Sequence, residues 1–262
     1  MWVGVNMIRN LYNYRQLLKS NVQKEIRGKY KGSFLGVLWS FVNPLLQVLI
    51  YAIVFPFILR NTQENYVVFL IIGILPWTWF TTSIGQGTPC ILYNAGIVKK
   101  VYFPREILPI SVVTSGMINY LISFIIILIF LLVSGIGFSI YILYIPLIII
   151  IQYILSFGIL LITSAINVYI RDAEYIVNFI INMLFDATPI LYSPEVFAKS
   201  PISWIFKINP LAVIITGYRD ALFYKTLPNL SSLGIVFVGS VVLLLIGIAI
   251  FRKLEKGFAE EV

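Results

Sequence analysis

The sequence predicts an all-α membrane protein with six transmembrane helices in a single domain, and three observations lead to this prediction. Of its 262 residues, 60% are hydrophobic and only 11% are charged, whereas about a quarter of a soluble protein is charged. Several apolar runs reach the roughly 18 residues that a helix needs to cross a bilayer. The Lys and Arg residues behind the formal net charge of +8 lie at the edges of these runs, which indicates membrane topology rather than nucleic-acid binding.

Residues 7–31 are predicted to form an amphipathic helix that lies in the membrane interface. Basic residues occupy the positions between apolar residues that recur at steps of three or four, namely Met7, Leu11, Tyr14, Leu18, Val22, Ile26 and Tyr30. Such a cationic face suits lipid headgroups, and a solvated helix packed on a soluble partner would show the same pattern. The first twenty residues lack an apolar run of about 7 to 15 residues, so no cleavable signal is expected.

Hydropathy places the six spans at residues 35–59, 66–83, 107–133, 138–170, 175–191 and 233–251. The fourth would be near 50 Å long as a continuous helix, so it is expected to protrude from the hydrocarbon layer or to bend. Between the second and third spans, the polar break at residues 94–100 is expected to form a short surface helix.

The segment between the fifth and sixth spans has a different pattern. Prolines interrupt two short apolar pieces within residues 202–224, and neither piece is long enough to cross a bilayer. Irregular backbone at membrane depth is tolerated only when it is buried in protein or lines a cavity, so two external re-entrant half-helices are expected. Six spans put both termini on one side. Most of the 19 Lys and Arg residues then lie on that side, which is therefore predicted to be cytoplasmic.

Polar residues follow helical spacing in three of the spans, so each set shares one helix face that should avoid lipid. The first set faces either other helices or a water-filled path, and both alternatives stay open for Asn43, Gln47 and Tyr51. The set in the fifth span comprises Asn178, Asn182 and Asp186. Asp186 is the one ionisable residue well inside a predicted span, which marks a functional residue unless it sits in water at the end of that span. The third span carries small polar residues typical of close helix packing, Ser111, Ser115, Asn119 and Ser123.

The sequence lacks the residue patterns of common catalytic sites. It contains no histidine, no Ser/His/Asp arrangement and no paired carboxylates, so catalysis is not expected. Its one cysteine, Cys90, can form neither an internal disulfide nor a metal cluster. No GxxxxGK[ST] loop is present to bind ATP. If the protein transports a substrate uphill, the energy should come from a partner.

Five runs of sequence occur in a family-specific order: KYKGSFLGVLWSFVNPLLQVLIY (29–51), FLIIGILPWTWF (69–80), VKKVYFPREILPIS (98–111), RDAEYIV (171–177) and TPILYSPE (188–195). Together they resemble the permease subunit of type 2 ABC exporters. The resemblance covers nearly the whole chain and is strongest to the branch that exports lipid-linked polysaccharide, such as O-antigen, capsule or teichoic acid.

This resemblance implies a homodimer of permeases in the bacterial cytoplasmic membrane, in contact with membrane lipid and paired with two ATP-binding cassette subunits. ATP and Mg²⁺ would bind to those partners, with no cofactor on this chain and no nucleic acid involved. A lipid-linked polysaccharide would pass between the two permeases. Which polymer is exported stays open.

The resemblance also implies roles for particular segments. Residues 7–31 look like the family's interface helix and residues 94–100 like its coupling helix. Contacts with the ATPase are therefore expected at Arg27, Tyr30, Asn94, Lys99 and Lys100. The half-helices at 202–208 and 211–224 resemble the family's gate helices. Spans one and five are expected to line the path with Asn43, Gln47, Tyr51, Asn178, Asn182 and Asp186.

Two alternatives remain. The first is a type 2 exporter of a small hydrophobic compound. The second is a membrane enzyme acting on a lipid-linked sugar, which needs acids or bases clustered at one membrane face. Only Arg171, Asp172 and Glu174 come near that requirement, and a charged corner between two spans explains them as well.

Overall fold

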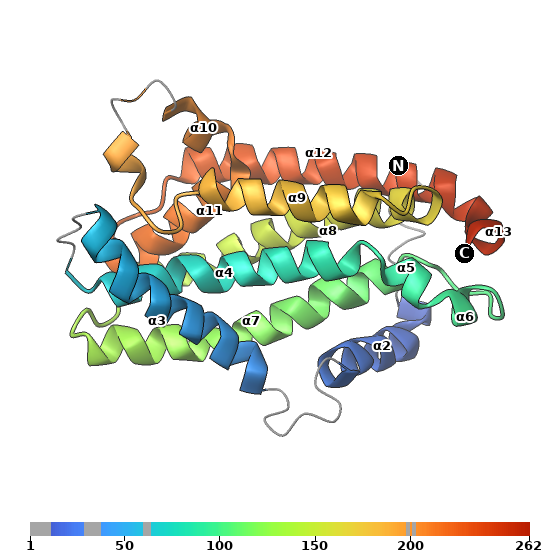
Figure 1. Ribbon diagram of the computed structural model, residues 1–262, viewed down its shortest axis with the longest axis horizontal. Helices are drawn as coiled ribbons and strands as arrows, with labels where there is room; N and C mark the ends of the chain where they lie inside the picture. The colour runs from blue at the N-terminus through green and yellow to red at the C-terminus, as the bar shows by residue number, and fades with distance from the viewer. Residues whose placement is uncertain (1–11, 29–37, 60–63, 198–199, 201–202) are drawn as a thin grey trace.

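The computed structural model describes residues 12–28, 38–59, 64–197, 200 and 203–262, and every regular element within this part is helical (Figure 1). The long helices form an elongated bundle with two distinct ends. One end carries the short helices α2, α5, α6 and α13 and the C-terminus, with bounds Arg15–Gly28, Cys90–Tyr93, Ala95–Val98 and Phe258–Glu261. The other end carries α10 and α11, with bounds Ser203–Ile208 and Pro210–Arg219. A π-helical turn, Asp220–Tyr224, follows α11.

Four helical segments are long and apolar enough to cross a membrane: Tyr66–Gly87, Ile107–Val133, Ile140–Tyr169 and Leu230–Glu261. They contain α4 (Tyr66–Gly87), α7 (Ile107–Val133), α8 (Ile145–Tyr169) and α12 (Leu230–Leu254). The chain is therefore a multi-pass membrane protein. The fourth predicted span is not one continuous α-helix, because a 3-10 turn, Ile140–Tyr144, precedes α8 and a proline lies at the start of that helix.

Of the remaining two predicted spans, the first begins at residues 35–37, outside the described residues, and the fifth is shorter in the structure than predicted. Helix α3 covers Trp39–Leu59, with a shorter apolar part at Val42–Phe55. Helix α9 covers only Ala173–Asp186, so the predicted helix over residues 175–191 ends early. Fourteen residues span about 21 Å, less than the roughly 30 Å of hydrocarbon. The backbone after Asp186 continues toward the α10 and α11 end in an irregular conformation.

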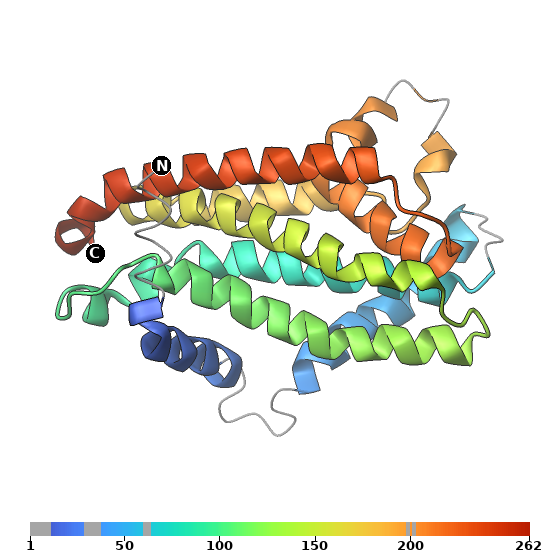
Figure 2. The same ribbon diagram turned by 180° about the vertical axis from the view of Figure 1, so that it is seen from behind.

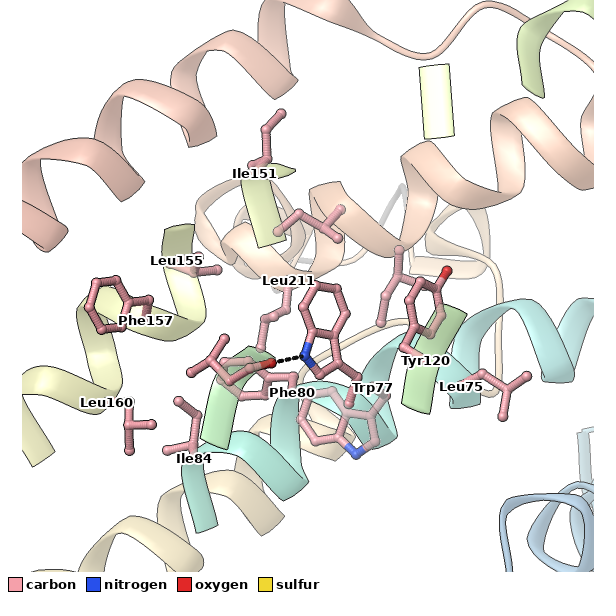
Figure 3. Close-up of a cluster of buried hydrophobic side chains, with 14 of the residues drawn as sticks. Leu75, Trp77, Phe80, Ile84, Tyr120, Ile151, Leu155, Phe157, Leu160 and Leu211 are labelled. Atoms are coloured by element: carbon pink, nitrogen blue, oxygen red, sulfur yellow. Dashed lines mark hydrogen bonds between the residues drawn. The ribbon is translucent and has the colours of Figure 1, made fainter. Parts of the chain in front are cut away.

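Helix α4 is the centre of the bundle, because it contacts α3, α7, α8, α9 and α11. Most of its residues are apolar and buried, as expected for a helix with many neighbours, although one side carries threonines and a glutamine. Figure 3 shows its Trp77, Phe80 and Ile84 among side chains of α7, α8 and α11. The buried amide of Gln152 on α8 donates a hydrogen bond of 2.8 Å to the carbonyl of Pro76. This bond pairs the buried side-chain nitrogen of Gln152 with the backbone carbonyl of the proline inside α4.

Helices α8 and α12 lie side by side over most of their length (Figure 2). Two glycines permit this close approach. A Cβ atom at Gly247 would lie 2.7 Å from the carbonyl oxygen of Gly158, and one at Gly158 would lie 2.9 Å from the backbone nitrogen of Leu244. Small residues let membrane helices approach closely in this way, since packing rather than the hydrophobic effect holds them together.

Helix α2 packs against α7 and is amphipathic, as the sequence predicts. Val22 is buried and Leu18 packs on the core, whereas Arg15, Lys19 and Lys24 are exposed. The rest of the predicted segment, residues 7–11 and 29–31, lies outside the described residues. The apolar face of α2 therefore packs against α7 within this chain.

The C-terminal residues fold back onto the bundle, although their sequence reads as a short charged tail. Phe258 is fully buried, with its ring 5.4 Å from Phe251 and 6.2 Å from Tyr169. The hydroxyl of Tyr169 donates to the carbonyl of Leu254 at 2.7 Å, and Arg105 donates to the carbonyl of Glu255. These contacts tie the loop before α7 to the C-terminus.

We expect Phe258→Ala to lower the free energy of unfolding by about 3 to 5 kcal/mol, because truncation leaves a cavity where three rings meet. Thermal unfolding of the purified chain in detergent measures the effect. Tyr102→Ala is the matched control, since Tyr102 lies at the same end and is 92% exposed. Equal unfolding midpoints for the two variants would contradict the anchoring role of Phe258.

Candidate functional site

One side of helix α4 carries small polar side chains that its neighbours leave partly open. Thr78, Thr81, Thr82 and Gly85 are half-buried and Gln86 is exposed, whereas most of the helix is buried. These positions recur at steps of three or four, so they share one face of the helix. Helices α3 and α9 border α4 on the side seen in Figure 1.

Two cavities lie along this face of α4. The first, of about 180 Å³, is bordered by polar and aromatic residues of α3, α4 and α7, among them Asn43, Thr78, Thr82, Gln86, Asn119, Ser123, Trp39, Trp79 and Tyr120. The second, of about 370 Å³, is bordered by Thr81, Thr82, Gly85, Gln86, Pro89, Tyr93, Glu174 and Asn178. Both cavities are bordered by Thr82 and Gln86, so they are neighbours, and together they are named here the α4 groove.

The polar set predicted on α3, Asn43, Gln47 and Tyr51, contributes to this region in two ways. Asn43 is exposed and borders the first cavity. Farther along the helix, the amide of Gln47 donates to the hydroxyl of Tyr51 at 3.1 Å. The Tyr51 ring in turn lies 6.1 Å from the ring of Phe185 on α9. This polar set therefore begins at the groove and ends in an aromatic contact between α3 and α9.

The polar set predicted on α9, Asn178, Asn182 and Asp186, is exposed at all three positions. Asn178 borders the second cavity and lies against α4, where a Cβ atom at Gly85 would meet its Oδ1 at 2.9 Å. Asn182 and Asp186 are exposed and border neither cavity. The backbone carbonyl of Asp186, the last residue of α9, accepts a hydrogen bond from the Tyr192 hydroxyl at 2.6 Å. The structure thus brings Asn43 and Asn178 to one groove and leaves Asn182 and Asp186 beside it.

The residues of α4 are not among those predicted to line the path, although Thr78, Thr82 and Gln86 recur every four residues and so share one helix face. All four polar residues of the third span are predicted from the sequence to serve helix packing. Ser111, Ser115 and Ser123 do bond to carbonyls of their own helix. Asn119 and Ser123 both border the first cavity, and Asn119 differs in that its buried Oδ1 has no hydrogen-bond partner in the described part of the chain.

The groove offers amide and hydroxyl groups beside aromatic rings, an arrangement that hydrogen-bonds a hydroxyl-rich ligand and packs against its apolar faces. Glu174, near α5, is the carboxylate among the residues that border the two cavities. Within the residues that the structure describes, no group of three or more His, Cys, Asp or Glu side chains could hold a metal ion. Glu174 has no second carboxylate beside it among these lining residues, so the lining offers hydrogen-bonding groups rather than an acid–base pair.

A second candidate region lies at the end with α2, α5 and α6. The ammonium group of Lys24 on α2 donates to Oδ1 of Asn94 at 2.7 Å, and Nδ2 of Asn94 donates to the carbonyl of Cys90. Asn94 is buried, so it ties α2 to the α5–α6 segment and leaves little of its own surface for a partner. Lys99 and Lys100 are exposed just beyond α6. Tyr30 and the side chain of Arg27 lie outside the described residues.

Taken together, the multi-pass helical fold, the polar groove along its central helix and the exposed basic loop define the membrane subunit of a transporter. Comparison with known proteins identifies the family. Residues 16–223 match the ABC-2 type transporter family, and the chain belongs to that family.

Relatives align over almost the whole chain. An O-antigen export system permease protein RfbA from Myxococcus xanthus is 35% identical over 98% of this chain and 100% of its own length. A protein of the same name from Klebsiella pneumoniae is 38% identical over 98% of this chain and 99% of its own. The polysialic acid transport protein KpsM of Escherichia coli is 24% identical over 89% of this chain and 91% of its own. The resemblance inferred from the five sequence runs is confirmed, as is the prediction of a permease subunit rather than an enzyme.

Proposed function

We propose that this chain is the channel-forming subunit of an ATP-driven exporter that moves a lipid-linked polysaccharide across the bacterial cytoplasmic membrane. The α4 groove is the observation that carries the proposal. Its amides, hydroxyls and aromatic rings suit a sugar polymer that must be held weakly while it moves. The relatives named as O-antigen export permeases and as a polysialic acid transport protein support the same substrate class.

In this proposal two copies of the chain assemble with their α4 grooves facing a shared path. The exposed polar stripe of α9 supports this arrangement, because Asn178, Asn182 and Asp186 would be costly against lipid tails. Helix α3, and α9 together with the irregular segment that follows it, complete six crossings. Helices α10 and α11 enter the membrane only part of the way from the external side. Both termini then lie in the cytoplasm with most of the basic residues.

ATP binds to two partner subunits in this proposal, and these dock at the end with α2, α5 and α6. The exposed Lys99 and Lys100 on the loop after α6 and the tie between Lys24 and Asn94 support this docking site. Movement of the partners would be passed to the bundle through α2, which packs on α7.

The two alternatives fit the structure less well. A small hydrophobic cargo would favour an apolar path, whereas about half of the residues that border the α4 groove are polar. The enzyme alternative rested on Arg171, Asp172 and Glu174. The backbone N–H of Glu174 donates to the buried Oδ1 of Asn167 at 3.1 Å, which supports a structural corner between α8 and α9.

We expect Asn43→Leu and Asn178→Leu each to lower export by about tenfold, because each variant removes hydrogen-bonding groups from the groove. Surface polymer is measured in cells that carry the cognate ATPase, together with protein level and copurified ATPase. Ser231→Leu, at an exposed position of α12 away from the groove, is the control. Full export by both groove variants would remove the α4 groove from the path.

A further inference from the structure

The backbone that follows α9 is irregular, yet side chains from elsewhere pair its carbonyl groups. The carbonyl of Ala187 accepts from the Asn209 amide at 3.1 Å, and that of Leu191 accepts from the Tyr66 hydroxyl at 2.7 Å. Those of Pro189, Ile190 and Tyr192 all accept from the guanidinium of Arg219. Irregular backbone at membrane depth needs such partners, because no water is available to replace them.

Arg219, the last residue of α11, is the centre of this arrangement and is only 1% exposed. Besides the three carbonyls after α9, it donates to the carbonyl of Phe69 on α4 at 3.4 Å. Its Cζ atom lies 3.4 Å from the centroid of the Phe69 ring. Gly73 leaves the space for the guanidinium, since a Cβ atom there would lie 2.7 Å from Nη2.

The planar fork of an arginine explains why this residue suits the position. Its two terminal nitrogens reach separate carbonyls while its face stacks on a ring, which the compact ammonium of a lysine cannot do. All the hydrogen-bond partners found for Arg219 in the described residues are backbone carbonyls. A buried cation is costly, so its presence calls for a role beyond filling space.

The opposite end of α11 is attached to the same irregular segment. Asn209 caps the helix by accepting from the backbone N–H of Leu211 at 3.0 Å. Its amide also donates to Thr188 Oγ1 at 2.9 Å, beside the bond to Ala187. Both ends of α11 therefore hold residues 187–192, which continue directly from α9. Helix α9, this segment and α11 are linked as one unit.

We propose that Arg219 is a positioning residue that couples α9 to α11, so that a displacement of α9 is transmitted to the half-helix at the far end of the bundle. The proposal rests on the proposed function, in which α9 borders the transport path. A movement of α9 that opens the path beside Asn178 would then move α11 with it. The end with α10 and α11 would open in step with the groove.

Labelling of introduced cysteines tests this coupling in the complete complex of the chain with its ATPase. The native Cys90 is buried, and burial raises the pKa of its thiol, so it should react slowly. Asn182→Cys reports on the exposed face of α9, and Thr216→Cys reports on the half-buried side of α11. Each is combined with Arg219, Arg219→Lys or Arg219→Met, and maleimide labelling rates are compared with and without a trapped ATP analogue. Arg171→Met, at an exposed arginine, is the control.

With Arg219 present, the ATP analogue should change both labelling rates by about fivefold or more. With Arg219→Met, the rate at Asn182→Cys should still change, the rate at Thr216→Cys should not, and export should fall while ATP hydrolysis persists. Arg219→Lys should lie between. A merely structural role would alter the response of the two reporters together. If the ATP analogue still changed the Thr216→Cys rate in Arg219→Met as it does with Arg219 present, the coupling would be overturned.

Two further outcomes are decisive. If Arg219→Met does not assemble, Arg219→Lys keeps a buried cation but loses the planar fork that reaches several carbonyls; a wild-type response at Thr216→Cys in that variant would overturn the coupling. If the unmodified complex neither exports polymer nor changes labelling at Asn182→Cys, the proposed function itself fails. The two failures are thereby distinguished.

Discussion

Replacing Gly247 with leucine is expected to separate α8 from α12 and to leave little folded protein. Even a Cβ atom at this position would lie 2.7 Å from the carbonyl oxygen of Gly158 and 3.3 Å from Leu161. The first obstacle is backbone, so rotation of a side chain cannot relieve it. Overpacking of this kind costs about 1 to 3 kcal/mol or more, and a whole helix pair depends on this contact.

The yield of monodisperse protein and the thermal unfolding midpoint in detergent measure this effect. Gly239→Leu is the matched control on the same helix, because nothing lies within 4 Å of a Cβ atom built at Gly239. It should fold like the unmodified chain. Helix propensity cannot cause a loss, because leucine favours a helix more than glycine does. Similar losses in the two variants would therefore mean that added bulk anywhere on α12, rather than the crossing of α8 and α12, is responsible.

The double substitution Lys99→Glu, Lys100→Glu is expected to abolish assembly with the ATPase or to uncouple its turnover. Both lysines are exposed at the end that the proposed function assigns to the cytoplasm, and reversing both charges makes any acidic groove on the partner repulsive. We expect the copurified ATPase to fall by at least about tenfold. The fold of the permease should be unaffected, since neither side chain is buried.

Co-expression with the cognate ATPase, followed by purification and a hydrolysis assay, measures this effect. Lys225→Glu reverses an exposed charge at the opposite end of the bundle and should leave assembly unchanged. Normal assembly and turnover of the double variant would exclude the α5–α6 loop as the docking site. If the unmodified chain binds no ATPase at all, the exporter proposal itself is wrong.

The helical pattern of the sequence was sufficient to find most of the elements of this fold. Residues 66–83 and 107–133 read as continuous apolar runs and lie in α4 and α7, because a helix surrounded by protein or lipid needs apolar residues on every side. The amphipathic spacing at Leu18 and Val22 predicted which face of α2 meets the core. Polar spacing alone also selected Asn43 and Asn178, which now border the α4 groove.

The end of α9 could not be predicted in the same way. Residues 187–191 are apolar enough to continue the span by hydropathy, but they include Pro189, which favours a helix end before it and which hydropathy alone does not register. The chain leaves the helix after Asp186 because Arg219, Asn209 and Tyr66 supply hydrogen bonds to the freed carbonyls. Pro189 therefore predicts that the helix ends, but the partners of the freed carbonyls are distant in sequence and no local pattern predicts them.

The sequence by itself determined that this chain is an all-helical membrane protein, which faces of its helices are polar and that it belongs to the ABC-2 transporters. The first two properties follow from composition and periodicity, which act over a few turns of helix, and the family follows from the similarity of its sequence runs to those of known permeases. Tertiary structure alone decided that α4 forms the floor of the groove, that Phe258 anchors the C-terminus and that Arg219 joins α11 to the end of α9. Each of these depends on contacts between residues far apart in the chain, whose energies are fixed only when the helices pack.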